Sequence, residues 1–248
     1  MSKFAVVTPY FKEAKPLLER CIGSVKRQTL KADHILVSDG HPQAWLDGTG
    51  TRHIRLDRAH DDFGNTPRGI GAQLAISEGY QGIAFLDADN WFDDDHLEVC
   101  CRAAESLSGK YIDCDYVIAQ RRMVRPDLTV IDAQEESGHV DTSCFFFLPG
   151  SYFMIPYWNL MPQQFSLMGD RIFFRHLAAK GLTSARTRKV TVNYLNLWES
   201  TYLFRGERPP EGAKPNADPS KAFAWYYGLP ERLKLIVERL IGLKIQPK

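Results

Sequence analysis

The sequence predicts an α/β fold, with a mostly parallel central sheet, helices on both of its faces and a helical extension at the C-terminus. Short apolar runs alternate with segments of helical periodicity through the first half of the chain, which is typical of parallel sheets. The 248 residues are enough for one large domain with a buried core. Hydrophobic residues make up 44% and charged residues 25% of the chain, as in ordinary globular proteins.

Hydrophobic spacing divides the first half of the chain into strands and helices. Short apolar runs predict strands that are buried on both faces. Such runs lie at residues 4–8, 34–38, 53–56 and 82–86. Apolar residues three and four positions apart predict helices that bury one side. This spacing covers residues 15–28, 67–79 and 94–107. Pro67 fits the first turn of the second helix, where its missing N–H is not needed.

The regular alternation ends after about residue 115. Tyr116–Ala119 and Met123–Val124 border a predicted hairpin, whose turn is Arg125–Leu128. An aromatic stretch over residues 144–155 is predicted to be strand-like, with an interruption at a Pro-Gly pair.

The last predicted elements are a helix over residues 170–180, a strand over 189–195, a mobile loop over 205–220 and an amphipathic helix over 230–243. Gly181 is a suitable end for the first of these helices. Proline and glycine are concentrated in the loop. We therefore expect a main domain over residues 1–204 and an extension over residues 205–248.

Charge and cysteine usage exclude several classes of protein. The net charge is +1, from 31 basic and 30 acidic residues, so we expect no nucleic-acid partner. The five cysteines form no C-x-x-C pair, and we expect them to be buried free thiols. There is no signal-like segment and no apolar stretch long enough to span a bilayer. The expected location is cytoplasmic, with peripheral contact at the inner face of the membrane as an alternative.

A pair of carboxylates follows the predicted strand over residues 82–86. Asp87 and Asp89 are two positions apart, so in an extended segment both side chains point to one side. Ligands of open α/β sheets bind beyond the carboxyl ends of the strands. Two neighbouring carboxylates repel each other unless a cation lies between them. The pair therefore predicts a Mn²⁺ or Mg²⁺ site that is shared with a diphosphate. The alternative is that Asp87 caps the next helix and Asp89 is a solvated loop residue.

Several motifs together carry a family resemblance. They are Val6–Phe11, Cys21–Thr29, Ile35–Gly40, Pro67–Gly69, Phe85–Asn90 and Gly169–Gly181. In this order and spacing the chain resembles the family-2 type of inverting glycosyltransferases with a GT-A fold, over roughly residues 3–200. The resemblance implies a GT-A-like main domain. It also implies transfer of a sugar from a nucleotide-sugar, with a UDP-linked donor the commonest in the family, to an acceptor hydroxyl.

The resemblance implies a role for each donor-side residue. Thr8 and Pro9 would line the nucleotide pocket, and Asp39 would accept a hydrogen bond from the base ring. Arg68 would reach the nucleotide or its phosphates. The metal ligands would be Asp89, as the principal one, and Asp87, which also lies near the ribose. The alternatives are a plain turn residue for Asp39 and a solvated cation for Arg68.

On the acceptor side the resemblance makes Asp170 the general base. Many relatives have Glu at the preceding position, where this chain has Gly169. The alternative for Asp170 is a helix cap, which is compatible with catalysis. His139–Ser143 resembles the segment that borders the acceptor site, and within it Asp141 would hold an acceptor hydroxyl. The alternative for Asp141 is a structural carboxylate that binds backbone amides.

Three questions about partners and class stay open at this level. The acceptor is a glycan, a lipid-linked molecule, a protein or a small molecule. The final helix presents a stripe of Leu233, Ile236, Val237, Leu240 and Ile241. This stripe predicts packing against the main domain or against a second copy in a homo-oligomer, or peripheral membrane contact. The competing classes are a haloacid-dehalogenase-like phosphatase, with Asp87 as its nucleophile motif, and a non-catalytic domain that binds nucleotides or glycans.

Overall fold

The computed structural model describes residues 4–108, 113–132, 139–216 and 218–245. Its strands are β1 (Phe4–Tyr10), β2 (Ala32–Ser38), β3 (Arg52–Arg55), β4 (Gly82–Phe85), β5 (Trp91–Phe92), β6 (Tyr116–Val124), β7 (Val130–Ile131), β8 (Phe145–Phe147) and β9 (Ser184–Leu195). Its α-helices are α1 (Lys15–Lys26), α2 (Asn65–Ser77), α3 (His96–Ser108), α4 (Tyr157–Leu160), α5 (Gly169–Ala179), α6 (Glu199–Phe204), α7 (Ser220–Tyr227) and α8 (Glu231–Ile241). The predicted α/β class is confirmed.

The strands form one sheet in the order β3-β2-β1-β4-β8-β6-β9-β5, and β7 pairs with β6. The four strands β3, β2, β1 and β4 are parallel to one another. β8 runs antiparallel between β4 and β6. β1 is buried along its whole length, which explains its uninterrupted apolar run. The parallel arrangement brings the carboxyl ends of β1, β2 and β4 to one edge of the sheet, where the predicted donor residues lie.

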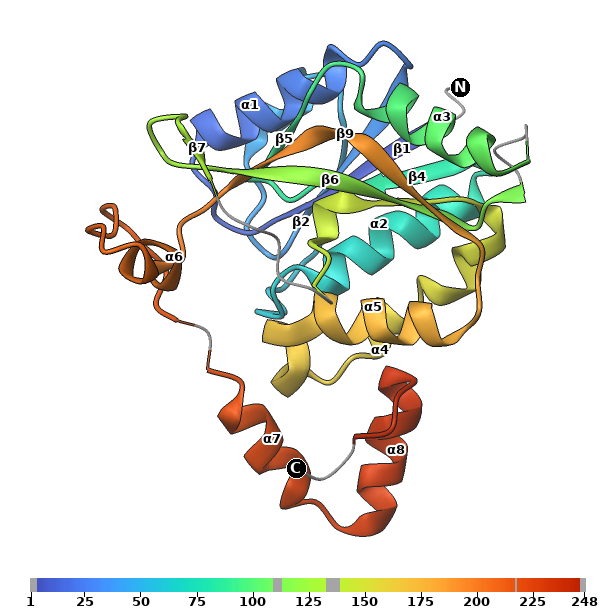
Figure 1. Ribbon diagram of the computed structural model, residues 1–248, viewed down its shortest axis with the longest axis vertical. Helices are drawn as coiled ribbons and strands as arrows, with labels where there is room; N and C mark the ends of the chain where they lie inside the picture. The colour runs from blue at the N-terminus through green and yellow to red at the C-terminus, as the bar shows by residue number, and fades with distance from the viewer. Residues whose placement is uncertain (1–3, 109–112, 133–138, 217, 246–248) are drawn as a thin grey trace.

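Helices cover both faces of the sheet (Figure 1). α1 and α3 lie on one face, and α2, α4 and α5 lie on the other. α2 approaches the sheet closely at Gly71. A Cβ atom added there would lie 2.7 Å from Cγ1 of Val7 and 2.8 Å from Cγ2 of Val37. The helix that carries Arg68 is therefore seated directly on β1 and β2.

Most of the predicted elements are present, with several differences. The predicted turn after Val124 is present, with Arg125 N–H donating to the carbonyl of Thr129 at 2.8 Å, but its two arms are β6 and β7, and the segments Tyr116–Ala119 and Met123–Val124 are both part of β6. The aromatic stretch over residues 144–155 contains only the three-residue strand β8, followed by a 3₁₀ helix over Pro149–Met154. Proline lacks the N–H that a continuing strand needs. The short elements β5, α6 and α7 were not predicted, and β9 begins at Ser184 rather than at residue 189.

The C-terminal helices pack against the chain itself. Val237 and Ile241 of α8 share a buried cluster with Phe165, Met161 and Tyr226. In Figure 1 the α7–α8 pair extends beyond α4 and α5. Packing on the main domain, one of the alternatives for the apolar stripe, is therefore present for part of it. None of the helices that the structure describes is both long and apolar enough to cross a membrane.

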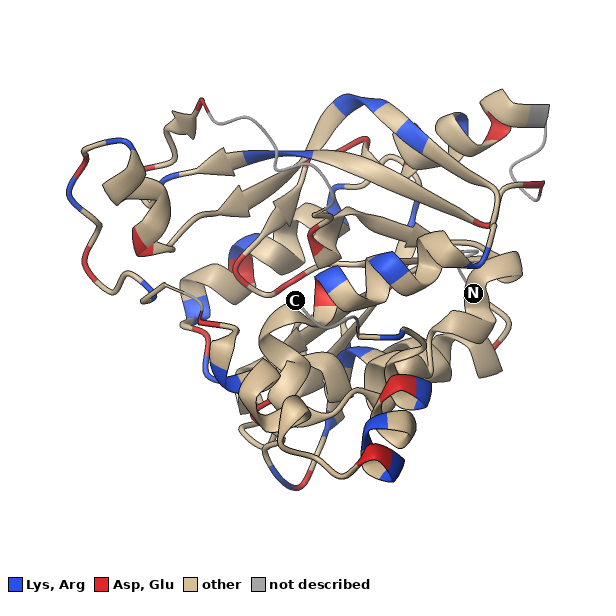
Figure 2. Cartoon of the chain, turned by 60° about the horizontal axis from the view of Figure 1, so that its bottom comes forward, with Lys and Arg blue, Asp and Glu red and all other residues tan. Residues whose placement is uncertain are grey.

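The segment before α7 is tied to the main domain at several points. The backbone of Lys214 pairs with that of Leu197 and Glu199, at 2.7 and 2.9 Å. The side chain of Arg125 donates to Glu207 at 2.9 and 3.0 Å. Figure 2 shows basic and acidic residues interspersed through the chain. The mobility predicted for residues 205–220 stays a prediction.

Candidate functional site

Asp87 lies at the carboxyl end of β4 and is held on both carboxylate oxygens. Its Oδ1 accepts a hydrogen bond from Arg68 at 2.7 Å, and its Oδ2 accepts one from Thr142 at 2.6 Å. Arg68 is 3% exposed, and its guanidinium lies over the ring of Trp158, 4.9 Å from the centroid. Arg68 is therefore not the solvated cation that the sequence left as an alternative. A buried guanidinium with one carboxylate partner is a suitable anchor for a second anion.

Asp89 lies beside Asp87 and contacts a different cation. Its Oδ2 accepts a hydrogen bond from the ammonium group of Lys214 at 3.3 Å. Its backbone carbonyl accepts one from Arg20 at 3.1 Å. Burial raises the pKa of Asp89, and the neighbouring Asp87 adds to this, while Lys214 lowers it. The charged form of such a buried carboxylate, with a second carboxylate beside it, is stabilised by a nearby cation.

The two carboxylates fit a divalent cation that takes its remaining ligands from elsewhere. Within the described residues there is no group of three or more His, Cys, Asp or Glu side chains arranged to hold a metal. Mg²⁺ in phosphate-handling sites is commonly held by one or two carboxylates together with substrate phosphates and water. The contact with Lys214 shows that positive charge is stabilised at Asp89. Asp89 and Asp87 are the residues that would hold the ion, and Lys214 would have to leave Asp89.

The other predicted donor residues lie at the ends of β1 and β2. Asp39 is 3% exposed and accepts hydrogen bonds from the backbone N–H of His60 at 3.0 Å and from its ring at 2.7 Å. Asp39 is therefore more than a plain turn residue. Thr8 is fully buried and its hydroxyl bonds to the ring of His34 at 2.8 Å. Pro9 lies against Gly64. Contact of these residues with a nucleotide stays a prediction.

Asp170 occupies the first turn of α5. Its Oδ1 accepts a hydrogen bond from the backbone N–H of Arg171, and its Oδ2 contacts Nε2 of His139, both at 2.6 Å. Its side chain is 23% exposed, and its role as the base stays a prediction. A Cβ atom at Gly169 would lie 2.9 Å from the amide nitrogen of Asn65. A larger residue at position 169 would therefore press on the side chain of Asn65.

One short segment, His139–Ser143, connects the two halves of the candidate site. His139 contacts Asp170, and Thr142 contacts Asp87. The hydroxyl of Ser143 accepts hydrogen bonds from the backbone N–H of Asp87 at 3.1 Å and from the amide of Asn90 at 3.0 Å. The segment therefore fixes the acid pair and the predicted base relative to each other.

Asp141, in the middle of this segment, is mainly engaged by the protein. It is 6% exposed, it pairs with Arg121 at 3.2 Å, and it accepts a hydrogen bond from the backbone N–H of Ser143 at 2.9 Å. Burial raises the pKa of Asp141 to about 6, although Arg121 lowers it. These contacts match the structural alternative for Asp141, and contact with an acceptor hydroxyl stays a prediction.

A comparison with protein-family models identifies the chain. The model described as Glycosyl transferase family 2 matches residues 5–157, more than half of the sequence. The chain belongs to glycosyl transferase family 2. The matched region contains β1 to β8 and every predicted donor residue. Asp170 follows it in the chain.

Solved structures agree with the GT-A fold of this family. Residues 1–349 of TarS from S. aureus in complex with UDP superpose with a TM-score of 0.59 and 12% sequence identity, covering 97% of this chain and 71% of that one. The complex of the same protein with UDP-GlcNAc gives a TM-score of 0.58 and 11% identity, covering 97% of this chain and 72% of that one. A longer TarS structure is covered over only 38% of its length. A search of curated protein sequences found no match.

Three residues of the site were not found from the sequence. Arg121, His139 and Lys214 come from β6, from the connection before β8 and from the segment before α7. His139 lies in a motif that was recognised, so its contact with the predicted base could have been suspected. Arg121 and Lys214 carry no local signal, because surface arginines and lysines are common and only the fold brings these two to the site.

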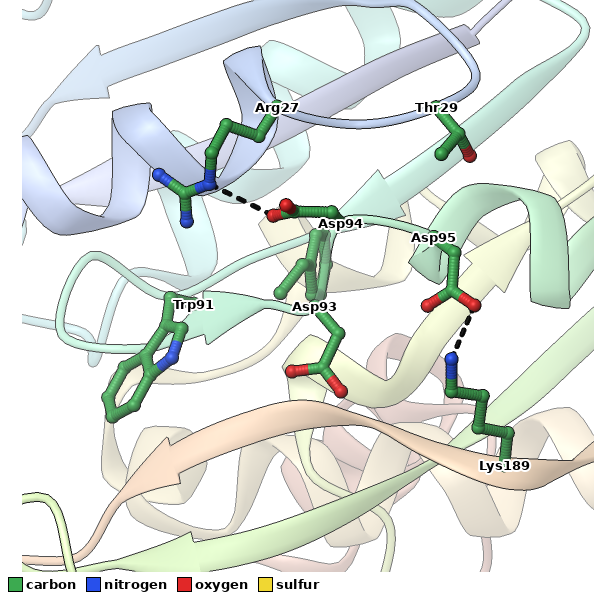
Figure 3. Close-up of a pocket in the computed structure, with 8 residues that line it drawn as sticks. Arg27, Thr29, Trp91, Asp93, Asp94, Asp95 and Lys189 are labelled. Carbon is green, nitrogen blue, oxygen red and sulfur yellow. Dashed lines mark hydrogen bonds and ion pairs between the residues drawn. The ribbon is translucent and has the colours of Figure 1, made fainter.

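A separate hollow of about 440 Å³ lies beside β5 (Figure 3). Asp93, Asp94 and Asp95 line it. Each has a cationic partner: Arg122, Arg27 and Lys189, respectively. These pairs balance the charge of the acidic run, and we assign no role in sugar transfer to this hollow.

Proposed function

We propose that this family-2 glycosyltransferase transfers a sugar from a UDP-linked donor to an acceptor hydroxyl with inversion, in a reaction that depends on Mn²⁺ or Mg²⁺. The observation that supports it most is that the segment His139–Ser143 contacts both Asp170 and Asp87, with Asp89 two positions after Asp87. The solved complexes of S. aureus TarS with UDP and with UDP-GlcNAc support the choice of donor. The acceptor class is open among glycans, lipid-linked molecules, proteins and small molecules.

In this proposal each residue has one task. Asp89 and Asp87 would hold the divalent ion, which would supply positive charge beside the diphosphate. Arg68, fixed by Asp87 and Trp158, binds a phosphate oxygen and orients the donor. Asp170 accepts the proton of the attacking acceptor hydroxyl. Attack from the face opposite the leaving group inverts the anomeric carbon.

A comparison of released products distinguishes the proposal from its two alternatives. The purified protein is incubated with Mn²⁺ and a panel of nucleotide-sugars, and free nucleoside diphosphate is followed, with hydrolysis to water serving in place of the unknown acceptor. We expect release from a UDP-sugar and little without metal. Release of inorganic phosphate from monoesters would instead indicate a phosphatase. Binding of a UDP-sugar without turnover would indicate a non-catalytic domain.

The variant Asp170→Asn tests the base. We expect turnover to fall by about 100-fold or more, because an amide cannot accept the proton. Affinity for UDP is expected to stay within about twofold, because Asp170 does not contact the donor phosphates in this proposal. The measurements are product release and UDP titration calorimetry. Asp94→Asn, on the separate hollow, is the matched control. Unchanged turnover in Asp170→Asn would remove this residue from the mechanism.

We also propose that the outer face of α8 contacts anionic membrane lipids. Leu233, Leu235 and Ile236 are 44%, 54% and 41% exposed, and the exposed Arg232 and Arg239 lie among them. Apolar residues interleaved with cations fit a negatively charged lipid surface. This face is separate from Val237 and Ile241, which pack inward.

Vesicle sedimentation tests this contact. The intact protein is expected to bind vesicles of phosphatidylcholine with 30% phosphatidylglycerol and not those of phosphatidylcholine alone. The double variant Leu235→Ser, Ile236→Ser should reduce binding at least about fivefold, because it removes apolar area that the membrane would bury. Concentration-dependent dimer formation that the same variant abolishes, without vesicle binding, would show that a second copy covers this face instead.

A further inference from the structure

We infer that His139 is a positioning residue for the proposed general base, Asp170. This inference rests on the proposed function, and it assigns the imidazole no proton-accepting role. Nε2 of His139 lies 2.6 Å from Oδ2 of Asp170. The side chains are 18% and 23% exposed, so this is a partly buried pair at the edge of the acceptor side.

The carboxylate of Asp170 indicates which nitrogen of His139 carries the proton. An ionised carboxylate only accepts hydrogen bonds, so Nε2 of His139, 2.6 Å from Oδ2 of Asp170, is the donor. Nδ1 lies 3.5 Å from a guanidinium nitrogen of Arg121, a long contact that is compatible with Nδ1 as an acceptor. The proton of a neutral imidazole is then on Nε2, which donates it to Asp170. Arg121 in turn is held by the buried Asp141 at 3.2 Å, so the orientation of the ring is set from the protein interior.

These contacts fix the carboxylate of Asp170. Oδ1 accepts from the backbone N–H of Arg171 and Oδ2 accepts from His139. Two donors on different oxygens restrict rotation about the last side-chain torsion, which is otherwise broad for Asp. One lone pair on each oxygen is then left for other partners.

Orientation matters because of the step that Asp170 performs. The acceptor O–H bond breaks as its proton moves to a free lone pair of Asp170. The acceptor oxygen forms the new bond to the anomeric carbon, and the bond to the diphosphate oxygen breaks with its electron pair leaving on the nucleotide. A base that is misplaced by about 1 Å can slow such a step about 100-fold. The N–H of His139 stays on the imidazole throughout.

The variants His139→Ala and His139→Gln separate positioning from a general structural effect. Glutamine can both donate to Asp170 and accept from Arg121, so it can replace both hydrogen bonds. We expect kcat to fall about 10- to 100-fold in His139→Ala, with the donor KM within about twofold of wild type. His139→Gln should recover most of kcat. Equal losses in both variants, or a loss confined to donor KM, would overturn the inference.

A double variant tests whether His139 acts through Asp170. In the Asp170→Asn background, His139→Ala is expected to cause no further loss of turnover, because the group that it orients is already disabled. Multiplicative losses would show that the two residues act independently, and would overturn the inference.

Nitrogen-15 NMR of the histidine side chains tests the same contact without turnover. We expect Nε2 of His139 to carry the proton that Asp170 accepts. A proton on Nδ1 would overturn the inference. If no nucleotide-sugar is turned over by the wild-type protein, the proposed function fails, while this spectrum still reports on the geometry. The two failures are therefore distinguishable.

Discussion

At the scale of single residues, the ammonium group of Lys214 occupies the position where the proposed cation would bind Asp89. The variant Lys214→Met is expected to bind Mn²⁺ about two- to fivefold more tightly, because the ion no longer displaces a competing charge. The expected change in affinity is small because the side chain of Lys214 is 49% exposed, and exposed ion pairs contribute about 0.2–1 kcal/mol. Titration calorimetry with Mn²⁺ measures the change.

Lys221→Met is the matched control, because Lys221 is exposed on α7 and has no contact with the acid pair. Its Mn²⁺ affinity should equal that of the wild type. Weaker Mn²⁺ binding in Lys214→Met would contradict the competition, and would indicate instead that this lysine supports the ion.

The acid pair and Arg68 could be predicted from the sequence, whereas the contacts of Thr142 and Lys214 with the pair could not. Asp87 and Asp89 were found because two carboxylates directly follow a buried strand, so their position at the sheet edge depends on local sequence alone. Thr142 and Lys214 reach them from 55 and 125 positions away. Contacts of such sequence separation depend on the order in which strands pair, which hydrophobic periodicity does not encode.

At the scale of elements, the close packing of α2 against the sheet depends on the absence of a side chain at Gly71. Gly71→Ala is expected to lower the free energy of unfolding by about 1–2 kcal/mol. The added methyl group would press on Val7 and Val37, at 2.7 and 2.8 Å, and overpacking of a core costs about 1–3 kcal/mol. The better helix propensity of alanine, about 1 kcal/mol, offsets part of this. Urea unfolding followed by circular dichroism measures the change.

Gly48→Ala is the comparison, because nothing lies within 4 Å of a Cβ atom placed there. Its free energy of unfolding should stay within about 0.5 kcal/mol of the wild type. Similar stability of both variants would mean that α2 can move away from the sheet at little cost.

Long elements with clear hydrophobic periodicity could be predicted from the sequence, and short elements could not. α1 and α3 have regular apolar spacing, and their buried faces follow it. β5 has two residues and α6 has six, which is too few for a period to be recognised. The place of β8 between β4 and β6 was also not predictable, because its all-phenylalanine sequence fits any buried strand. The order of strands in the second half therefore had to come from the structure.

At the scale of the whole molecule, three buried histidines make the fold sensitive to acid. Burial lowers the pKa of His34 and of His96 to about 3 and that of His176 to about 4. In the unfolded chain each ring has a pKa near 6.5. Their contribution to stability is therefore fully present above about pH 6.5, and is lost as the pH falls toward about 3–4. Asp141, with its pKa raised to about 6, acts in the opposite direction, as do Glu13 and Asp89, whose pKa values burial also raises.

The free energy of unfolding is accordingly expected to fall as the pH drops from about 6 to about 4.5, because the unfolded chain binds protons on these three histidines that the folded chain does not, each worth about 1.4 kcal/mol per pH unit. Urea unfolding at a series of pH values measures this slope. His34→Gln keeps a polar partner for Thr8 but cannot be protonated. Its unfolding should therefore take up about one proton fewer, and its free energy of unfolding should change less steeply with pH, by about 1.4 kcal/mol per pH unit. A stability that is equal at pH 7 and pH 4.5 would contradict the expectation, because it would require these buried rings to accept protons without unfolding.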